Sequence, residues 1–121
     1  MNGRIRSFRE FWPFYLGEHA RPATRALHIA GSTLALALAV LAVVLRVPLL
    51  LVVALVTGYA FAWVAHATVE HNRPATFRYP LWSFVADWKM WGCALTGRLG
   101  RELERAGVRP SVGEKSAAAS R

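Results

Sequence analysis

The chain has 121 residues, the size of one domain, and a formal charge of +8 because 15 Lys and Arg outnumber 7 Asp and Glu. Hydrophobic residues make up 55% of it, a high fraction for a soluble protein, and the positive charges flank apolar segments, which favours anionic lipid over nucleic acid as the partner. The one cysteine, Cys93, excludes an internal disulfide and a cysteine-based zinc site.

Residues 7–19, with the sequence SFREFWPFYLGEH, are predicted to form the first helix. Ser7 and Glu10 have the spacing of a capping box, which marks a helix start. One face of this helix carries Phe8, Phe11, Trp12, Tyr15, Leu16 and His19. An aromatic face of this kind suits an amphipathic helix that lies in the headgroup region of a membrane, with His19 directed inward.

Two uncharged runs follow, at residues 27–45 and 49–67. About 20 apolar residues are needed to cross the hydrocarbon core of a bilayer, and neither run has the polar face expected of a soluble helix. Arg46 and Pro48 break the chain between the runs, so an antiparallel transmembrane hairpin is predicted. The alternative, two buried helices of a soluble bundle, is disfavoured because so short a chain has too little other structure to cover them.

The Lys and Arg residues predict the orientation of the hairpin. Five arginines precede the first span, Arg46 alone lies in the turn, and nine Lys and Arg follow the second span. Because positive charge is retained on the cytoplasmic side, both termini are expected in the cytoplasm.

A third helix is predicted at residues 79–97, where Asp87 and Lys89 argue against a full span and favour an interfacial position. Residues 1–99 are therefore expected to form a single membrane-embedded domain, and the polar residues 100–121 a disordered tail. The predicted fold class is an all-α integral membrane protein, in which a transmembrane hairpin is flanked by N- and C-terminal amphipathic interfacial helices.

The phrase Glu-His-x-Arg-Pro-Ala-Thr occurs twice, at residues 18–24 and 70–76, once on each side of the hairpin. Proline is favoured in the first turn of a helix. Each copy is therefore expected to be a loop that leads into a helix, with Arg21 and Arg73 at the level of the lipid phosphates.

Histidines are predicted to meet where the hairpin opens toward the cytoplasm. His28 lies 19 residues before Val47 and His66 lies 19 residues after it, which puts both at one depth in an antiparallel hairpin. Each lies at one end of a stripe of small residues on its helix, which allows membrane helices to approach closely, so the two imidazoles are expected to face each other. An ionisable residue at membrane depth marks a candidate functional site.

His19 and Glu70 complete a set of nitrogen and oxygen donors with these two histidines. Iron in many oxygenases is held by two histidines and a carboxylate, and zinc accepts the same donors, so a metal site is predicted without a choice of ion. His71 is expected to be structural, and whether Asp87 joins the site is left open.

Three stretches carry a family resemblance: FYLGEH at 14–19, LHIAG at 27–31 and HATVEHNRPA at 66–75. Over roughly residues 8–95 the chain resembles the small membrane family of the 2-hydroxy fatty acid α-dioxygenase of phytosphingosine breakdown, the Mpo-type enzymes. Residues 72–91 look especially like bacterial members. The resemblance implies loss of one carbon from a 2-hydroxy fatty acid, with Fe(2+) and dioxygen. It also implies His19, His28 and His66 as ligands, and Glu70 matches the pattern too.

The predicted function is therefore a membrane non-haem iron dioxygenase at the cytoplasmic face of a bacterial-type inner membrane. Its expected partners are a lipid or fatty-acyl substrate, dioxygen and the bilayer, with no nucleic acid and with a homo-oligomer left open. Arg21, Asn72 and Arg73 are the candidates for holding the substrate carboxylate or headgroup.

Two rival functions are kept. The first is a non-catalytic membrane hairpin that binds lipid or a partner protein, and the second is a b-type haem held by facing histidines. A membrane di-iron site is disfavoured because the chain has only four histidines.

Overall fold

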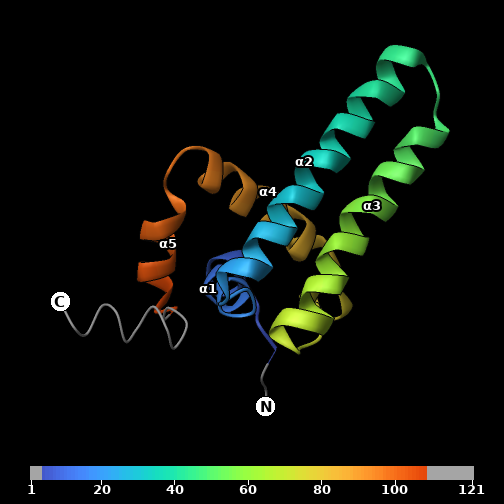
Figure 1. Cartoon of the computed structure of the whole chain (residues 1–121). Coiled ribbons are helices and arrows are strands. Elements are labelled where there is room, and N and C mark those ends of the chain that lie inside the picture. The colour runs from blue at the N-terminus through green and yellow to red at the C-terminus, as the bar shows by residue number, and fades with distance from the viewer. Residues whose placement is uncertain (1–3, 109–121) are drawn as a thin grey trace.

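A computed structural model describes residues 4–108, and all the regular structure in that range is helical, as the sequence predicts. The elements are α1 (Phe8–Gly17), α2 (Pro22–Leu45), α3 (Leu49–Ala65), the π-helical turn η1 (His66–Glu70), the 3-10 turn η2 (Ala75–Phe77), α4 (Pro80–Leu95) and α5 (Leu99–Ala106). The helices α2 and α3 lie side by side and run in opposite directions, and α1, α4 and α5 gather around one end of this pair (Figure 1).

Helix α1 begins at the predicted cap, where the Ser7 hydroxyl accepts a hydrogen bond of 3.2 Å from the backbone N–H of Glu10. Its aromatic face, however, is buried inside the protein. Phe11 and Tyr15 are 0% and 1% exposed, and the ring of Phe11 lies 5.3 Å from that of Tyr79. The prediction of a headgroup-facing aromatic surface is wrong for this face, because η2 and α4 supply an apolar partner from a distant part of the chain.

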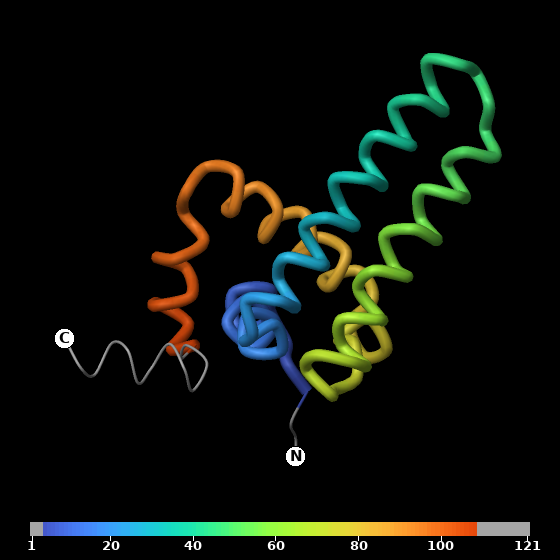
Figure 2. The backbone as a smooth tube through the Cα atoms, in the orientation of Figure 1, coloured from blue at the N-terminus to red at the C-terminus, as the bar shows by residue number. Residues whose placement is uncertain are grey.

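The connection between α2 and α3 is a tight turn at the far end of the pair (Figure 2). Arg46 ends α2 in the left-handed conformation with φ 58°, and the Val47 N–H donates to the Ala42 carbonyl at 2.9 Å. This pattern satisfies carbonyl groups at the helix end, and Pro48, which cannot continue a helix, follows at once.

Small residues let α2 and α3 approach each other closely, as the sequence stripes predict. Ala42, Ala54 and Ala62 are buried. At Gly31 the contact is tighter still, because an added Cβ would lie 2.5 Å from the Cβ of Phe61. No real Cβ tolerates such a distance, so this crossing requires glycine.

Gly31→Ala should therefore destabilise the fold by about 1–3 kcal/mol, since Phe61 or the helix backbone has to move. The measurement is thermal unfolding of the purified protein in detergent. Gly92→Ala is the matched control, because an added Cβ in the middle of α4 meets nothing within 4 Å. That change should be neutral or stabilise by up to about 1 kcal/mol, through the better helix propensity of alanine. Equal losses for the two variants would contradict the close-packing explanation.

The outer half of the α2–α3 pair exposes large apolar side chains. Val43, Val44 and Leu49 are 72%, 68% and 67% exposed, and only 22% of the most apolar window of each helix is buried. The segments Pro22–Leu45 and Leu49–Glu70 are long and apolar enough to cross a membrane by length and composition. An apolar surface of this size on a small chain marks a site of interaction with something apolar.

The C-terminal part of the described chain departs from the sequence prediction. Residues 100–106 were expected in a disordered tail, but they belong to α5, whose Leu99, Leu103 and Ala106 pack against the core around α1 and α4. The indole N–H of Trp12 also donates to Glu102 at 2.8 Å. The three apolar side chains recur at helical spacing, and a neighbouring core lets so short a stripe hold a helix. The rest of the predicted tail, from residue 109, lies outside the described residues.

Candidate metal centre

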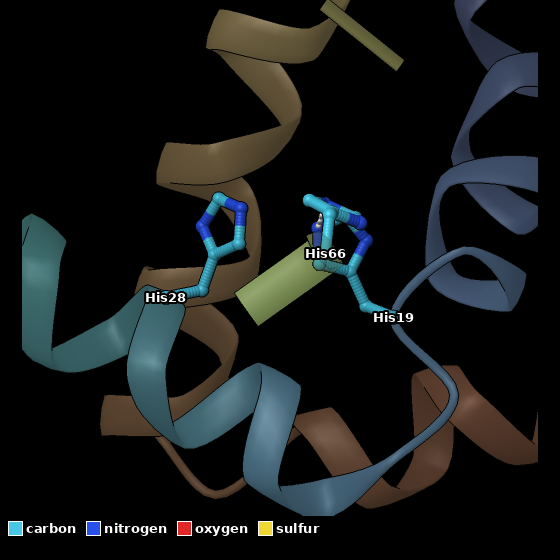
Figure 3. A group of neighbouring side chains, drawn as sticks. All are labelled: His19, His28 and His66. Atoms are coloured by element: carbon cyan, nitrogen blue, oxygen red, sulfur yellow. Dashed lines mark hydrogen bonds between the residues drawn. The ribbon is translucent and has the colours of Figure 1, made fainter. Parts of the chain in front are cut away.

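Three histidines from separate segments meet at the end of the α2–α3 pair that lies next to α1 and α4. Figure 3 shows His28 on one side and His19 and His66 together on the other. The ring centroid of His19 lies 4.6 Å from the ring centroid of His28 and 4.6 Å from that of His66. All three side chains are at most 5% exposed, and one nitrogen from each lies within 4.8 Å of the others. The arrangement is that of a buried site able to hold one metal ion.

His19 follows the end of α1 and is oriented by that helix. Its Nδ1 lies 2.7 Å from the backbone carbonyl oxygen of Tyr15, so Nδ1 carries the hydrogen and donates it. The other nitrogen, Nε2, then carries a free lone pair. Burial, followed by the neighbouring His28, lowers the pKa of His19 well below its usual value, so the ring is neutral at pH 7 and able to bind a metal.

His66 is oriented by the chain that leaves α3. The wide turn η1 is followed by His71 in the left-handed conformation, and this brings Asn72 back so that its N–H donates to the His66 carbonyl at 3.0 Å. Nδ1 of His66 lies 2.6 Å from Oδ1 of Asn72. The amide is held in this orientation because its Nδ2 donates to the Glu18 carbonyl at 3.2 Å. Nε2 of His66 is therefore also left with a free lone pair.

His28 faces a carboxylate from α4. Its Nδ1 lies 3.7 Å from Oδ1 of Asp87, longer than a hydrogen bond, and the Tyr15 hydroxyl donates to the same oxygen at 2.5 Å. Burial raises the pKa of Asp87 to about 7. His19 and His66 thus each have a hydrogen-bonded oxygen at Nδ1, the pattern by which metal-binding histidines are oriented in proteins, and for His28 the Asp87 carboxyl lies opposite Nδ1 at a longer distance.

The distance between Nε2 of His19 and Nε2 of His66 is 3.1 Å. Since both Nδ1 atoms donate elsewhere, neither Nε2 has a hydrogen to offer the other, and two lone pairs that face each other this closely need a cation between them. Two imidazole nitrogens on one ion, each at about 2.1 Å, lie about 3.0–3.4 Å apart. The donor set therefore fits a bound metal ion.

Glu70 does not join this group, in contrast to the prediction. Its Oε2 accepts hydrogen bonds from the backbone N–H of Arg21 at 2.6 Å and from the Thr24 hydroxyl at 2.7 Å. A carboxylate in this position caps the start of α2 and interacts favourably with the positive end of the helix dipole.

The repeated phrase is explained by these contacts. Glu70 of the second copy binds Arg21 and Thr24 of the first, while Glu18 of the first copy accepts from Asn72 of the second. The two copies hold the chain ends on each side of the α2–α3 pair together. The first copy starts a long helix as predicted, whereas the second leads into the short turn η2.

The predicted substrate residues take other places. Asn72 supports His66, and the exposed side chains of Arg21 and Arg73 do not line the cavity that contains the histidines. The guanidinium of Arg73 lies 5.4 Å from the ring centre of Phe77 instead. His71 is exposed and ends η1, in keeping with a structural role.

The structure also places Tyr15, Ser83 and Asp87 at the site, of which Tyr15 and Ser83 were not predicted from the sequence and Asp87 was left open. Among residues 4–108, the Ser83 hydroxyl is the one buried side-chain polar group without a hydrogen-bond partner. It lines the same cavity as the histidines. Because buried polar groups are almost always paired, this hydroxyl points to a ligand in the cavity. The only sequence signal was a polar pair, Ser83 and Asp87, spaced one turn apart in an otherwise aromatic helix.

Residues 5–99 match the Mpo1-like family, described as 2-hydroxy-palmitic acid dioxygenase Mpo1-like. Comparison with curated proteins gave no match, and neither did comparison with solved structures.

Proposed function

The chain belongs to the Mpo1-like family, and from this premise and the histidine geometry we propose that it is a membrane-embedded, Fe(2+)-dependent dioxygenase that shortens a 2-hydroxy fatty acid by one carbon. The observation that carries the proposal is the convergence of His19, His28 and His66, each with an oxygen atom opposite its Nδ1. Three protein ligands with further positions open is the usual composition of a catalytic metal site. The family description favours iron over zinc.

The proposal places α2 and α3 across the membrane as a hairpin. The large exposed apolar side chains on the outer half of this pair support that placement, and so do the lengths of the two helices. The excess of Lys and Arg outside the hairpin turn favours a cytoplasmic position for both termini, and with them for the histidines. A fatty acid dissolved in the bilayer then reaches the site without leaving the apolar phase.

The chain's own residues bind and orient the reactants in this proposal. Three imidazole ligands add no negative charge, so the site would keep the full charge of a divalent cation and attract the substrate carboxylate. Bound there, iron supplies the open coordination positions and the dioxygen activation that the reaction requires. The unpaired Ser83 hydroxyl donates a hydrogen bond to an oxygen of the substrate. The buried walls of the cavity exclude bulk water.

The test is made on protein purified without oxygen. We expect near-stoichiometric iron, together with dioxygen uptake that depends on a 2-hydroxy fatty acid and yields an acid one carbon shorter. The matched control substrate is the acid of the same length without the 2-hydroxyl, which should give no uptake. Absence of bound metal in folded protein would overturn the metal site. Tightly bound zinc with no uptake would overturn the dioxygenase and leave the site.

A further inference from the structure

A second cavity adjoins the histidine cavity. It lies between α2, α3 and α4 and shares His28 and Asp87 with the histidine cavity as common walls. From there it continues along α3 past Gly58 to Ala54. His66 and Ala54 are twelve residues apart, so the two cavities together follow α3 for about 18 Å.

The lining of this groove is suited to an extended alkyl chain. Its floor is made of small residues, Ala35, Ala54 and Gly58, and its other wall is made of aromatic side chains from α4, Phe84 and Trp88. The floor is tight, since a Cβ added at Gly58 would touch the Cβ of Ala35 at 3.5 Å. Larger side chains on the floor would fill the space. Ser32 and Tyr59 also line the groove, but among residues 4–108 it has no charged side chain beyond the end that it shares with the histidine cavity. A groove lined mostly by apolar side chains suits methylene groups better than a charged headgroup.

The two ends of the combined cavity differ in chemistry. The inner end has three histidine nitrogens, the Asp87 carboxyl and the unpaired Ser83 hydroxyl, and the outer end is apolar. A molecule that fills both parts is polar at one end and a hydrocarbon over the rest. The inner end is small and most of its walls are buried side chains, so it admits a carboxyl group more readily than a phospholipid headgroup.

We infer that the groove between α2, α3 and α4 binds the alkyl chain of a free fatty acid, with the carboxyl end at the three histidines. The inference rests on the proposed function for the identity of the carboxyl end. It adds a chain-binding subsite whose floor at Ala35 and Gly58 limits the thickness of the chain that enters.

The first test is photolabelling with a 2-hydroxy fatty acid that carries a diazirine midway along its chain, on the full-length protein in lipid nanodiscs. The expected labels fall on the groove residues Tyr59, Phe84 and Trp88. A phospholipid with a diazirine at the same chain position is the comparison, and it should label the outer apolar surface around Val43 and Leu49. Equal labelling of the groove by the phospholipid, or labels from the acid only on the outer surface, would overturn the inference.

Variants make the test specific. Ala35→Leu should reduce groove labelling by the acid at least about tenfold, because the added atoms fill the floor. Ala37→Leu is the matched control: it is the same change on the same helix, at an exposed position outside the groove, and it should leave labelling unchanged. Equal labelling in the two variants would overturn the inference.

A second pair of variants tests the inference in case Ala35→Leu does not fold. Phe84→Ala removes an aromatic wall from a side chain that is already 42% exposed, and it should weaken binding of the acid about fivefold. Phe77→Ala, which removes an exposed aromatic ring outside the groove, should not. The labelling is carried out without iron and without dioxygen. Failure of the dioxygenase reaction would therefore leave the groove labels in place, whereas failure of the chain-binding inference would remove them from a protein that still binds metal.

Discussion

Replacement of His66 by alanine should lower the affinity for iron more than about 100-fold and abolish dioxygen uptake in proportion. Loss of an orienting partner of a metal ligand already costs about 10–100-fold, so loss of the ligand itself should cost more. The Nε2 atoms of His66 and His19 are 3.1 Å apart, and the remaining two histidines cannot hold the ion at the same geometry. The measurement is metal content after purification without oxygen, followed by titration of the metal-free protein with Fe(2+).

The fourth histidine provides the control for this prediction. His71 is five residues further along the chain, exposed, and in the left-handed conformation with φ 60°. His71→Asn removes an imidazole of the same type while keeping a side chain that tolerates this conformation, and it should leave iron binding unchanged. A loss of iron equal to that of His66→Ala would contradict the assignment of the site to the three buried histidines.

The proximity of His28 and His66 could be predicted from the sequence because two patterns in it agree. His28 and His66 are equally far from the turn, and each continues a stripe of small residues on its helix. In an antiparallel pair those two facts place both rings at one depth and on facing sides. The structure brings the two rings to 5.9 Å and adds His19 beside them, with its ring 4.6 Å from each.

The carboxylate was assigned wrongly for a local reason. Four residues separate His66 from Glu70, so a regular α-helix would put both on one face. The chain forms the wider turn η1 instead, and the changed rotation directs Glu70 to the start of α2. The carboxyl group next to the histidines comes from Asp87, and its proximity to His28 depends on how α4 packs beside α2. No spacing in the sequence contains that information.

The predictions for the aromatic face of α1 and for residues 100–106 were wrong because they depend on contacts with distant parts of the chain. The apolar face of α1 was predicted correctly, but a pattern shows only that a face is apolar and does not identify what covers it. Residues 100–121 were predicted to be disordered because they are mostly polar, and the short apolar stripe that ends in Leu103 and Ala106 was not recognised. The residues that cover the aromatic face of α1 belong to η2 and α4, about 60–80 residues further along the chain. Phe11 and Tyr15 are therefore part of the protein core. The same core stabilises α5, because a helix as short and polar as this one would not be stable without a neighbouring apolar surface.

Replacement of Asn72, which holds the ring of His66 in place, is the second change expected to have a large effect on iron binding. Asn72→Leu should weaken iron binding about 10–100-fold, because a side chain of similar size without the amide oxygen leaves Nδ1 of His66 without its acceptor and frees the ring to turn. The measurement is again titration of the metal-free protein. Asn72→Asp keeps an oxygen acceptor, and it should restore most of the affinity.

The same variants show whether Asn72 orients the metal ligand His66 or instead contacts the substrate. If Asn72 held the substrate carboxylate, Asn72→Leu would raise the KM for the 2-hydroxy acid and leave iron affinity unchanged. Arg73→Ala is the comparison at the next residue, and its exposed side chain lies outside the histidine cavity. It should leave iron affinity as in the unmodified protein. Loss of iron in Asn72→Leu with recovery in Asn72→Asp thus requires the amide oxygen to act through His66, since a general loss of packing would not return with a single oxygen atom.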